Sequence, residues 1–235
     1  MITEKYSYVA TPRAEINGVR HYCLPDGAKV ASVTTILSAT TPPEKAAALQ
    51  NWRNRVGHAA AAEITKQAAG RGTRMHKWLE NYVLSDALDE PGTNPYSIQS
   101  NAMAAEIIKQ GLVNVSEYWG VEVPLYYSGI YAGTTDCVGV WRDKPAILDF
   151  KQSNKPKKVE WIEDYFLQLA AYSESHNNMH GTKINTGVIL MCSPPPTTAE
   201  QPIYQEFSIT GERYDHFANL WWARVEQYYT QLADK

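Results

Sequence analysis

The chain has 235 residues, of which 44% are apolar and 20% charged, and its formal net charge is −3 at pH 7. This composition supports one or two folded domains, and the 11% aromatic content argues against disorder and coiled coil. The slight acidity excludes a protein that coats nucleic acid or membranes through bulk positive charge.

The cysteines and the chain start indicate a cytoplasmic protein. Cys23, Cys137 and Cys192 are too few and too far apart for a disulfide framework or a four-thiolate metal site. The sequence has no apolar run long enough to span a membrane, and its first residues lack a secretion or transit signal. We therefore expect a protein of a bacterial cell or a phage-infected host, with no membrane partner.

The first half is predicted to be mostly helical. Residues 1–43 should form a β-hairpin, turning at Asn17-Gly18, and a lead-in that ends near the prolines at 42–43. Apolar residues that recur every three or four positions then predict a helix over 44–67 and another over 97–113. Between them, a break is predicted at 70–73, followed by a helix capped by Thr73. Residues 44–118 thus make a helical region that contributes His76.

The second half is predicted to be mixed. Residues 121–128, 131–141 and 146–150 are β-branched and aromatic runs between turn segments, so we expect three consecutive antiparallel strands. A helix over 161–177, strands at 184–192 and 202–209, and a helix over 212–232 should follow. The predicted fold is α/β, with a mixed central sheet flanked by helices, a core over 119–235, and a single compact domain overall.

Two acids and a lysine carry the strongest chemical pattern. Asp149 and Lys151 are two residues apart in a strand and therefore share a face, while Phe150 points the other way. A hairpin can bring Asp136 beside Asp149, and two such carboxylates need a cation such as Mg²⁺ or Mn²⁺. Alternatively, Asp-Phe-Lys is simply a strand end that passes into solvent.

Further polar residues lie on predicted helices. Gln168 and Tyr172 are four residues apart and share a mostly buried face, where they support a site or simply cap the core. His76 lies at the edge of an apolar stripe, where a structural role is the common one. Glu80, one turn later, could orient His76 or be solvated.

These residues occur in the order of a known family. His76, Gly133-x-x-Asp136, Asp149-x-Lys151 and Gln168-x-x-x-Tyr172 resemble the RecB-type branch of the PD-(D/E)xK nucleases. More closely, RGTRMHKWLE, SVTTIL, NWRNRVG, LDFKQSNKPKK and LQLAAY resemble the mitochondrial genome maintenance exonuclease family and its phage-encoded relatives, from about residue 30 to the last helix. The resemblance implies a restriction-endonuclease-like core behind a helical N-terminal half.

The resemblance also implies an activity. It suggests a metal-dependent DNA exonuclease that prefers single strands with a free end, in DNA replication, recombination, repair or phage DNA metabolism. His76, Asp136, Asp149 and the Phe150 backbone carbonyl would bind one or two Mg²⁺ or Mn²⁺ ions, and Lys151 would be the catalytic lysine. No nucleotide cofactor is expected, and three scattered cysteines exclude an iron–sulfur cluster.

DNA contacts are expected at a few basic segments and not over the whole protein surface. Gln168 and Tyr172 would support the site and contact DNA, and the basic segments 53–77 and 151–158 flank it in sequence. Supporting or DNA-binding positions are expected at Thr134, Ser153, Arg71, Arg74 and Lys155, with less definite roles for Glu80 and Glu122. Aromatic residues near these segments could stack on bases, although most should be core: Trp52, Trp78, Tyr126, Tyr127, Tyr131 and Trp161.

The sequence is also compatible with other functions. An endonuclease with the same core and a non-catalytic single-stranded DNA-binding accessory protein, with replication or recombination partners, are the alternatives. A zinc hydrolase using His176 and His180 is disfavoured because the glutamate of a zinc-protease helix is missing.

Overall fold

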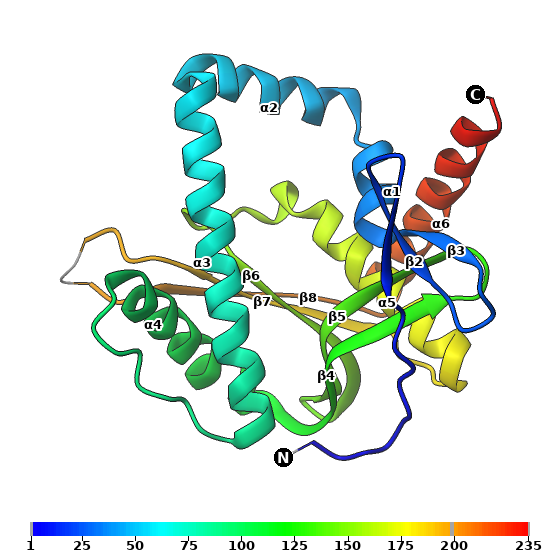
Figure 1. Cartoon of the computed structure of the whole chain (residues 1–235). Coiled ribbons are helices and arrows are strands. Elements are labelled where there is room, and N and C mark those ends of the chain that lie inside the picture. The colour runs from blue at the N-terminus through cyan, green and yellow to red at the C-terminus, as the bar shows by residue number, and fades with distance from the viewer. Residues whose placement is uncertain (1, 198–199, 235) are drawn as a thin grey trace.

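The computed structural model describes residues 2–197 and 200–234, which form a mixed sheet with helices on both faces (Figure 1). The sheet has eight strands in the order β1-β2-β3-β5-β6-β7-β8, and β4 pairs with β5 outside this path. The strands are β1 (Arg13–Ile16), β2 (Val19–Cys23), β3 (Lys29–Ser32), β4 (Val115–Tyr127), β5 (Tyr131–Trp141), β6 (Lys144–Gln152), β7 (Thr186–Ser193) and β8 (Ile203–Thr210). This confirms the predicted α/β class.

Six α-helices lie within the described residues: α1 (Val33–Ala39), α2 (Pro43–Val56), α3 (His58–Ser85), α4 (Pro95–Gln110), α5 (Glu163–His180) and α6 (Glu212–Ala233). Two 3₁₀ turns, η1 (Leu112–Asn114) and η2 (Val159–Trp161), precede β4 and α5. Within the described part of the chain, no helix combines the length and apolarity needed to cross a membrane.

The sheet combines antiparallel and parallel pairs. β4, β5 and β6 are antiparallel neighbours, as predicted from the three β-prone runs. β6 pairs in parallel with β7 after the α5 crossover, and β3 pairs in parallel with β5, which joins the N-terminal hairpin to the central strands. The hairpin turns at Asn17 and Gly18, both with positive φ (52° and 76°), as the Asn-Gly signal predicts.

A separate core lies on each face of the sheet. On one face α1, α5 and α6 pack on the strands around fully buried residues such as Trp221, Tyr131 and Phe166. On the other face α3 and α4 cover Phe150 and Leu148. Phe150 therefore points away from its neighbours Asp149 and Lys151, as expected for alternating strand positions.

The predicted helix break at residues 70–73 is wrong. The chain breaks at Gly57, whose φ of 89° ends α2, and α3 then continues through Gly70 and Gly72 to Ser85. Thr73 is consequently an interior helical residue, whose hydroxyl donates to the Ala69 carbonyl, and not a cap. Gly72 allows close packing, because a Cβ at this position would lie 3.2 Å from Cγ of Gln152 on β6.

The segment over 30–37, which lies within the predicted lead-in, is divided between β3 and α1. Ser32 ends the strand and caps the helix, since its hydroxyl accepts from the Thr35 backbone N–H.

Helix α2 and the first half of α3 form a feature that we call the arch, residues 43–70. In Figure 1 α2 runs from α1 across the top of the molecule and meets the upper end of α3, which descends past the sheet. Within the arch only Ala61 is buried, whereas the second half of α3 buries Met75, Leu79 and Val83. The arch is therefore anchored at its ends rather than packed along its length.

Candidate active site

Four elements bring acidic and imidazole side chains to one place. Ligand-type atoms of His76 (α3), Glu122 (β4) and Asp136 (β5) all lie within 4.8 Å of one another. Asp149, on the neighbouring strand β6, is 2% exposed and contacts the Lys151 ammonium. Of the predicted metal ligands, His76 and Asp136 thus lie in one group with Glu122, and Asp149 lies near Asp136 and contacts Lys151.

Asp136 is held from two sides. Its Oδ1 lies 3.2 Å from His76 Nδ1, and its Oδ2 accepts a 2.6 Å hydrogen bond from the Phe150 backbone N–H. Since His76 comes from α3 and Phe150 from β6, Asp136 links the helical first half to the central strands. The contact between the Phe150 backbone carbonyl and a metal ion stays a prediction.

The charges of the cluster are mutually dependent. Burial raises the pKa of Asp149 to about 6, and Asp136 adds to this rise although Lys151 opposes it. Burial also acts to raise the pKa of Asp136, but His76, Lys151 and the Phe150 N–H outweigh it and hold this pKa below its usual value. Burial alone would lower the pKa of Lys151, but Asp149 and Asp136 raise it overall.

These residues fit a divalent cation. Carboxylate oxygens with one imidazole are donors that Mg²⁺ or Mn²⁺ accepts. Asp149 is almost completely buried beside Asp136, an arrangement that like-charge repulsion disfavours unless cations compensate it. His76, Glu122, Asp136 and Asp149 are the residues that could hold such an ion.

Glu122 takes an unusual backbone conformation. Its neighbours Val121 and Val123 pair with Cys137 and Thr135, so Glu122 lies across from Asp136. Its φ is 51°, in the left-handed region that non-glycine residues in strands rarely occupy. Burial raises the pKa of its carboxyl, and the nearby charge of Asp136 raises this pKa further. This strained strand position directs the side chain into the cluster.

Gln168 and Tyr172 lie behind the cluster on α5. Gln168 Nε2 donates to the Tyr172 hydroxyl at 3.3 Å, and Tyr172 is only 3% exposed. Gly133 makes room for this ring, since a Cβ there would lie 2.8 Å from Tyr172 Cε1 and from its hydroxyl oxygen. Gly133 and Tyr172, which are far apart in the sequence, are therefore direct neighbours in the structure.

A groove of about 590 Å³ lies next to Lys151. One wall comes from the arch and the other from residues 152–165, including Tyr165, whose ring is 5.2 Å from Lys151 Nζ. The lining contains lysines and aromatics and no carboxylate: Trp52, Ile64, Ala68, Gln152, Ser153, Asn154, Lys155, Pro156, Lys157, Trp161 and Tyr165. Of the six aromatic residues considered for stacking, Trp52 and Trp161 line this groove, whereas Tyr131 is fully buried.

The supporting residues divide into those at the groove and those elsewhere. Arg71 donates from Nε to Gln152 Oε1 at 2.9 Å and also contacts Asn154, so it joins α3 to the groove wall. Ser153 and Lys155 line the groove, and the Ser153 hydroxyl donates to the Lys155 carbonyl.

Arg74, Glu80 and Thr134 lie outside the groove. The Arg74 guanidinium stands 5.4 Å from the Tyr96 ring, in a different depression. Glu80 pairs with Lys77 and borders a second depression, of about 500 Å³, together with His76 and Glu122. Thr134 is half-buried on β5, opposite Pro124.

Tyr165 was missed by the sequence analysis. It precedes Gln168 by three residues and Tyr172 by seven, which places the three side chains along one helix face. Extending that face backwards by one turn would have identified it. Burial raises the pKa of its hydroxyl, so the ring meets Lys151 as a neutral aromatic.

Comparison with known proteins gives consistent matches. The chain is 30% identical over 216 residues to mitochondrial genome maintenance exonuclease 1 of Xenopus tropicalis, which covers 88% of this chain and 59% of that protein. It is 28% identical over 207 residues to the Mus musculus protein of the same name (85% and 59% covered) and 26% identical over 209 residues to that of Homo sapiens (85% and 58%). No protein-family model matches the chain.

The fold has a counterpart among solved structures. A crystal structure of a candidate exonuclease from Eubacterium rectale superposes with a TM-score of 0.50 at 13% identity, covering 71% of this chain and 66% of that one. The chain therefore resembles PD-(D/E)xK-like exonucleases in sequence and in fold, which confirms the predicted resemblance. It spans only about 59% of the length of the relatives it matches.

Proposed function

We propose that the chain is a metal-dependent deoxyribonuclease that degrades single-stranded DNA from a free end. The observation that carries this proposal is an acidic cluster with Lys151, whose ammonium faces Tyr165 in the wall of a groove with cations and aromatics but no carboxylate. Exonuclease names among the relatives agree with it.

The side chains would have different roles in phosphodiester hydrolysis. His76, Glu122, Asp136 and Asp149 would hold one or two divalent ions, which when bound neutralise charge on the phosphate and acidify water. Lys151, which contacts Asp149 and faces Tyr165, would contact the scissile phosphate or orient the attacking water. Gln168 and Tyr172 support this arrangement from α5.

The groove supports the proposed preference for single strands. Trp52 and Trp161 offer ring faces on which unpaired bases can stack, and Trp161 is 57% exposed. Lys155 and Lys157 offer charge to the phosphates. Stacking with backbone neutralisation is the sequence-tolerant way to bind single strands.

The test is a time course on end-labelled DNA. Linear single-stranded, linear double-stranded and circular single-stranded DNA are incubated with Mg²⁺, with Mn²⁺ and with a chelator. We expect progressive shortening of the linear single strand, only with metal, while the circle persists. Cutting of the circle would instead identify an endonuclease, and DNA binding without hydrolysis a non-catalytic accessory protein.

A further inference from the structure

The second depression, of about 500 Å³, adjoins the acidic cluster on the side of the N-terminal hairpin. Its lining comes from β1, α3 and β4: Arg13, Gly72, Thr73, His76, Lys77, Glu80 and Glu122. His76 and Glu122 belong to both the depression and the cluster. The cluster therefore borders this depression, while Lys151 faces Tyr165 in the wall of the groove.

The groove and the second depression follow one another along α3. Ile64 and Ala68 line the groove, whereas the lining residues between positions 72 and 80 belong to the depression. His76 contacts Asp136 between the two. A single strand that lies in the groove and continues along α3 would therefore cross the acidic cluster and reach the second depression.

Phosphate binding in the second depression needs a cation that is not already paired. Of the two basic side chains in the lining, Lys77 lies with its Nζ 2.9 Å from Glu80 Oε2. Among residues 2–197 and 200–234, no carboxylate pairs with Arg13, which is exposed. Glu122 is the remaining acid of the lining, and a divalent ion in the cluster would neutralise it. The charge of Arg13 is therefore available to an anion.

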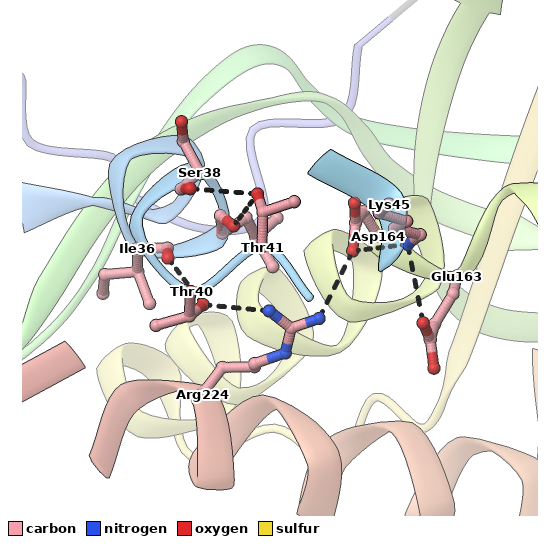
Figure 2. Close-up of polar contacts among 9 residues, drawn as sticks. Ile36, Ser38, Thr40, Thr41, Lys45, Glu163, Asp164 and Arg224 are labelled. Atoms are coloured by element: carbon pink, nitrogen blue, oxygen red, sulfur yellow. Dashed lines mark hydrogen bonds and ion pairs between the residues drawn. The ribbon is translucent and has the colours of Figure 1, made fainter. Parts of the chain in front are cut away.

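The cations where α2 begins show the opposite arrangement. Lys45 Nζ lies 3.1 Å from Asp164 Oδ1 and 3.5 Å from Glu163 Oε2 (Figure 2). Arg224 of α6 lies 3.8 Å from the same Asp164 oxygen and donates to the Thr40 hydroxyl at 3.1 Å (Figure 2). Carboxylates already compensate these charges, and the pairs join helices to one another. Their arrangement is structural, unlike that of Arg13.

The hairpin holds Arg13 in position. Arg13 and Tyr22 are paired across β1 and β2, and Arg13 Nε donates to the Tyr22 hydroxyl at 3.3 Å. Tyr22 is 3% exposed and packs against Val30 and its neighbours in a small core of its own. Burial raises the pKa of Glu122, and Arg13 is among the nearby charges that oppose this rise. The guanidinium is thus oriented by a buried partner beside the acidic cluster.

We infer that Arg13 binds a phosphate of the DNA strand on the opposite side of the scissile bond from the groove. This inference rests on the proposed function and gives the N-terminal hairpin a substrate contact. Lys155 and Lys157 would neutralise phosphates on the groove side, so the scissile phosphate would be held over the cluster from both sides. A guanidinium suits this role because it can donate two hydrogen bonds to one phosphate.

The experiment uses linear single-stranded oligonucleotides in which one linkage at a time is a neutral methylphosphonate. With the unsubstituted protein, a neutral linkage at the position of Arg13 should slow single-turnover cleavage by about tenfold, as for the loss of one charge-assisted hydrogen bond. Arg13→Met should be slowed by a similar factor on ordinary DNA, and the neutral linkage at that position should then cause no further loss. Neutral linkages on the groove side should slow both proteins equally.

Three variants serve as controls. Arg20→Met removes the same charge from the same hairpin, but Arg20 lines a different depression with α1 and α6, so sensitivity to every neutral linkage should persist. Arg13→Lys keeps the charge and should keep most of the sensitivity. Tyr22→Phe removes the hydrogen bond that orients Arg13 and should weaken the sensitivity at the same position only.

A binding measurement gives a readout that does not depend on cleavage. In the Asp149→Asn background with Mg²⁺, adding Arg13→Met should make the slope of log affinity against log salt shallower by about 0.7, the value for one phosphate contact with a single strand.

Two results would overturn the assignment of Arg13: uniform slowing by Arg13→Met with unchanged sensitivity to every neutral linkage, or an unchanged salt slope. The first would show that Arg13 acts through Glu122 or the hairpin and not on the DNA. Absence of metal-dependent cleavage of linear DNA by the unsubstituted protein would instead overturn the proposed function.

Discussion

Helix α5 buries nine of its eighteen residues, whereas α2 buries none of its fourteen. The first helix carries Gln168 and Tyr172 behind the acidic cluster, where positions must be maintained within fractions of an ångström. The second forms the outer side of the groove, which in the proposed function takes up the DNA strand. In the proposed function, the residues for the chemistry would therefore lie on a packed helix and access to the groove would depend on a weakly packed one, which has low local stability.

The largest expected effect tests the packed region. Asp149→Asn should slow cleavage of single-stranded DNA by about a thousandfold, equivalent to about 4 kcal/mol of transition-state stabilisation, because an amide cannot neutralise a cation or hold Lys151. DNA binding should persist, since the groove lining is untouched. Single-turnover cleavage and fluorescence anisotropy measure the two properties.

Asp143→Asn, in the exposed turn between β5 and β6, is the matched control and should cleave normally. Undiminished cleavage by Asp149→Asn would remove Asp149 from the active site.

A methyl group in the packed region should destabilise the protein. Gly133→Ala places a Cβ 2.8 Å from the buried Tyr172 ring, so the free energy of unfolding should fall by about 1–3 kcal/mol, as for other overpacked cores. Urea denaturation measures the change. The effect should be smaller when Tyr172→Leu is already present, because the smaller side chain vacates the space. Simple additivity in this double-mutant cycle would argue against the clash.

Acid should weaken the packing at the far end of α5. His176 is buried, with Nε2 3.1 Å from the Tyr8 hydroxyl and Nδ1 2.8 Å from Thr182 Oγ1. Burial, followed by the charge of the neighbouring His180, lowers the pKa of His176 to about 3. Burial also lowers the pKa of His180. Between about pH 6.5 and pH 3 the unfolded chain binds the extra proton, so this stability is present above pH 6.5 and is lost as the pH falls.

The expected slope is about 1.4 kcal/mol per pH unit for one such histidine. Urea denaturation at pH 7, 6 and 5 should therefore show a shallower loss for His176→Gln than for the unsubstituted protein. Parallel curves for the two proteins would contradict the assignment.

The smallest expected effect tests the arch. Leu49 on α2 is 47% exposed, so Leu49→Ala should change the free energy of unfolding by less than about 0.5 kcal/mol. The same substitution at the fully buried Leu169 of α5 should cost about 2–5 kcal/mol. Paired denaturation curves measure both. Similar losses at the two positions would show that the arch is packed as firmly as α5.

Local patterns made much of this structure predictable. The β5–β6 hairpin and the common direction of Asp149 and Lys151 follow from strand alternation, and the Asn17-Gly18 turn from backbone freedom. Gly70 and Gly72 predict a helix break as local breakers, but α3 continues through both. Packing against Gln152 decides that Gly72 stays helical, and sequence alone does not reveal this contact.

The candidate site shows the same limit. His76, Asp136 and Asp149 could be selected because they match a family pattern, but Glu122 enters the cluster through a left-handed strand position that no local signal announces. Lys45 and Asp164 belong to helices that are far apart in the sequence, and only the fold makes them neighbours. Contacts between distant parts of the chain are therefore not predictable from local patterns, and the residues that were selected across elements were selected through the family pattern.

The short connection between β5 and β6 also bears on the order of folding. Asp136 and Phe150 are 14 residues apart, whereas His76 lies on a helix that must dock from a distant part of the chain. Contacts of small sequence separation form early because little loop entropy opposes them. We therefore expect both aspartates and Lys151 to meet in an early hairpin whose charges already partly balance, with His76 joining as α3 docks.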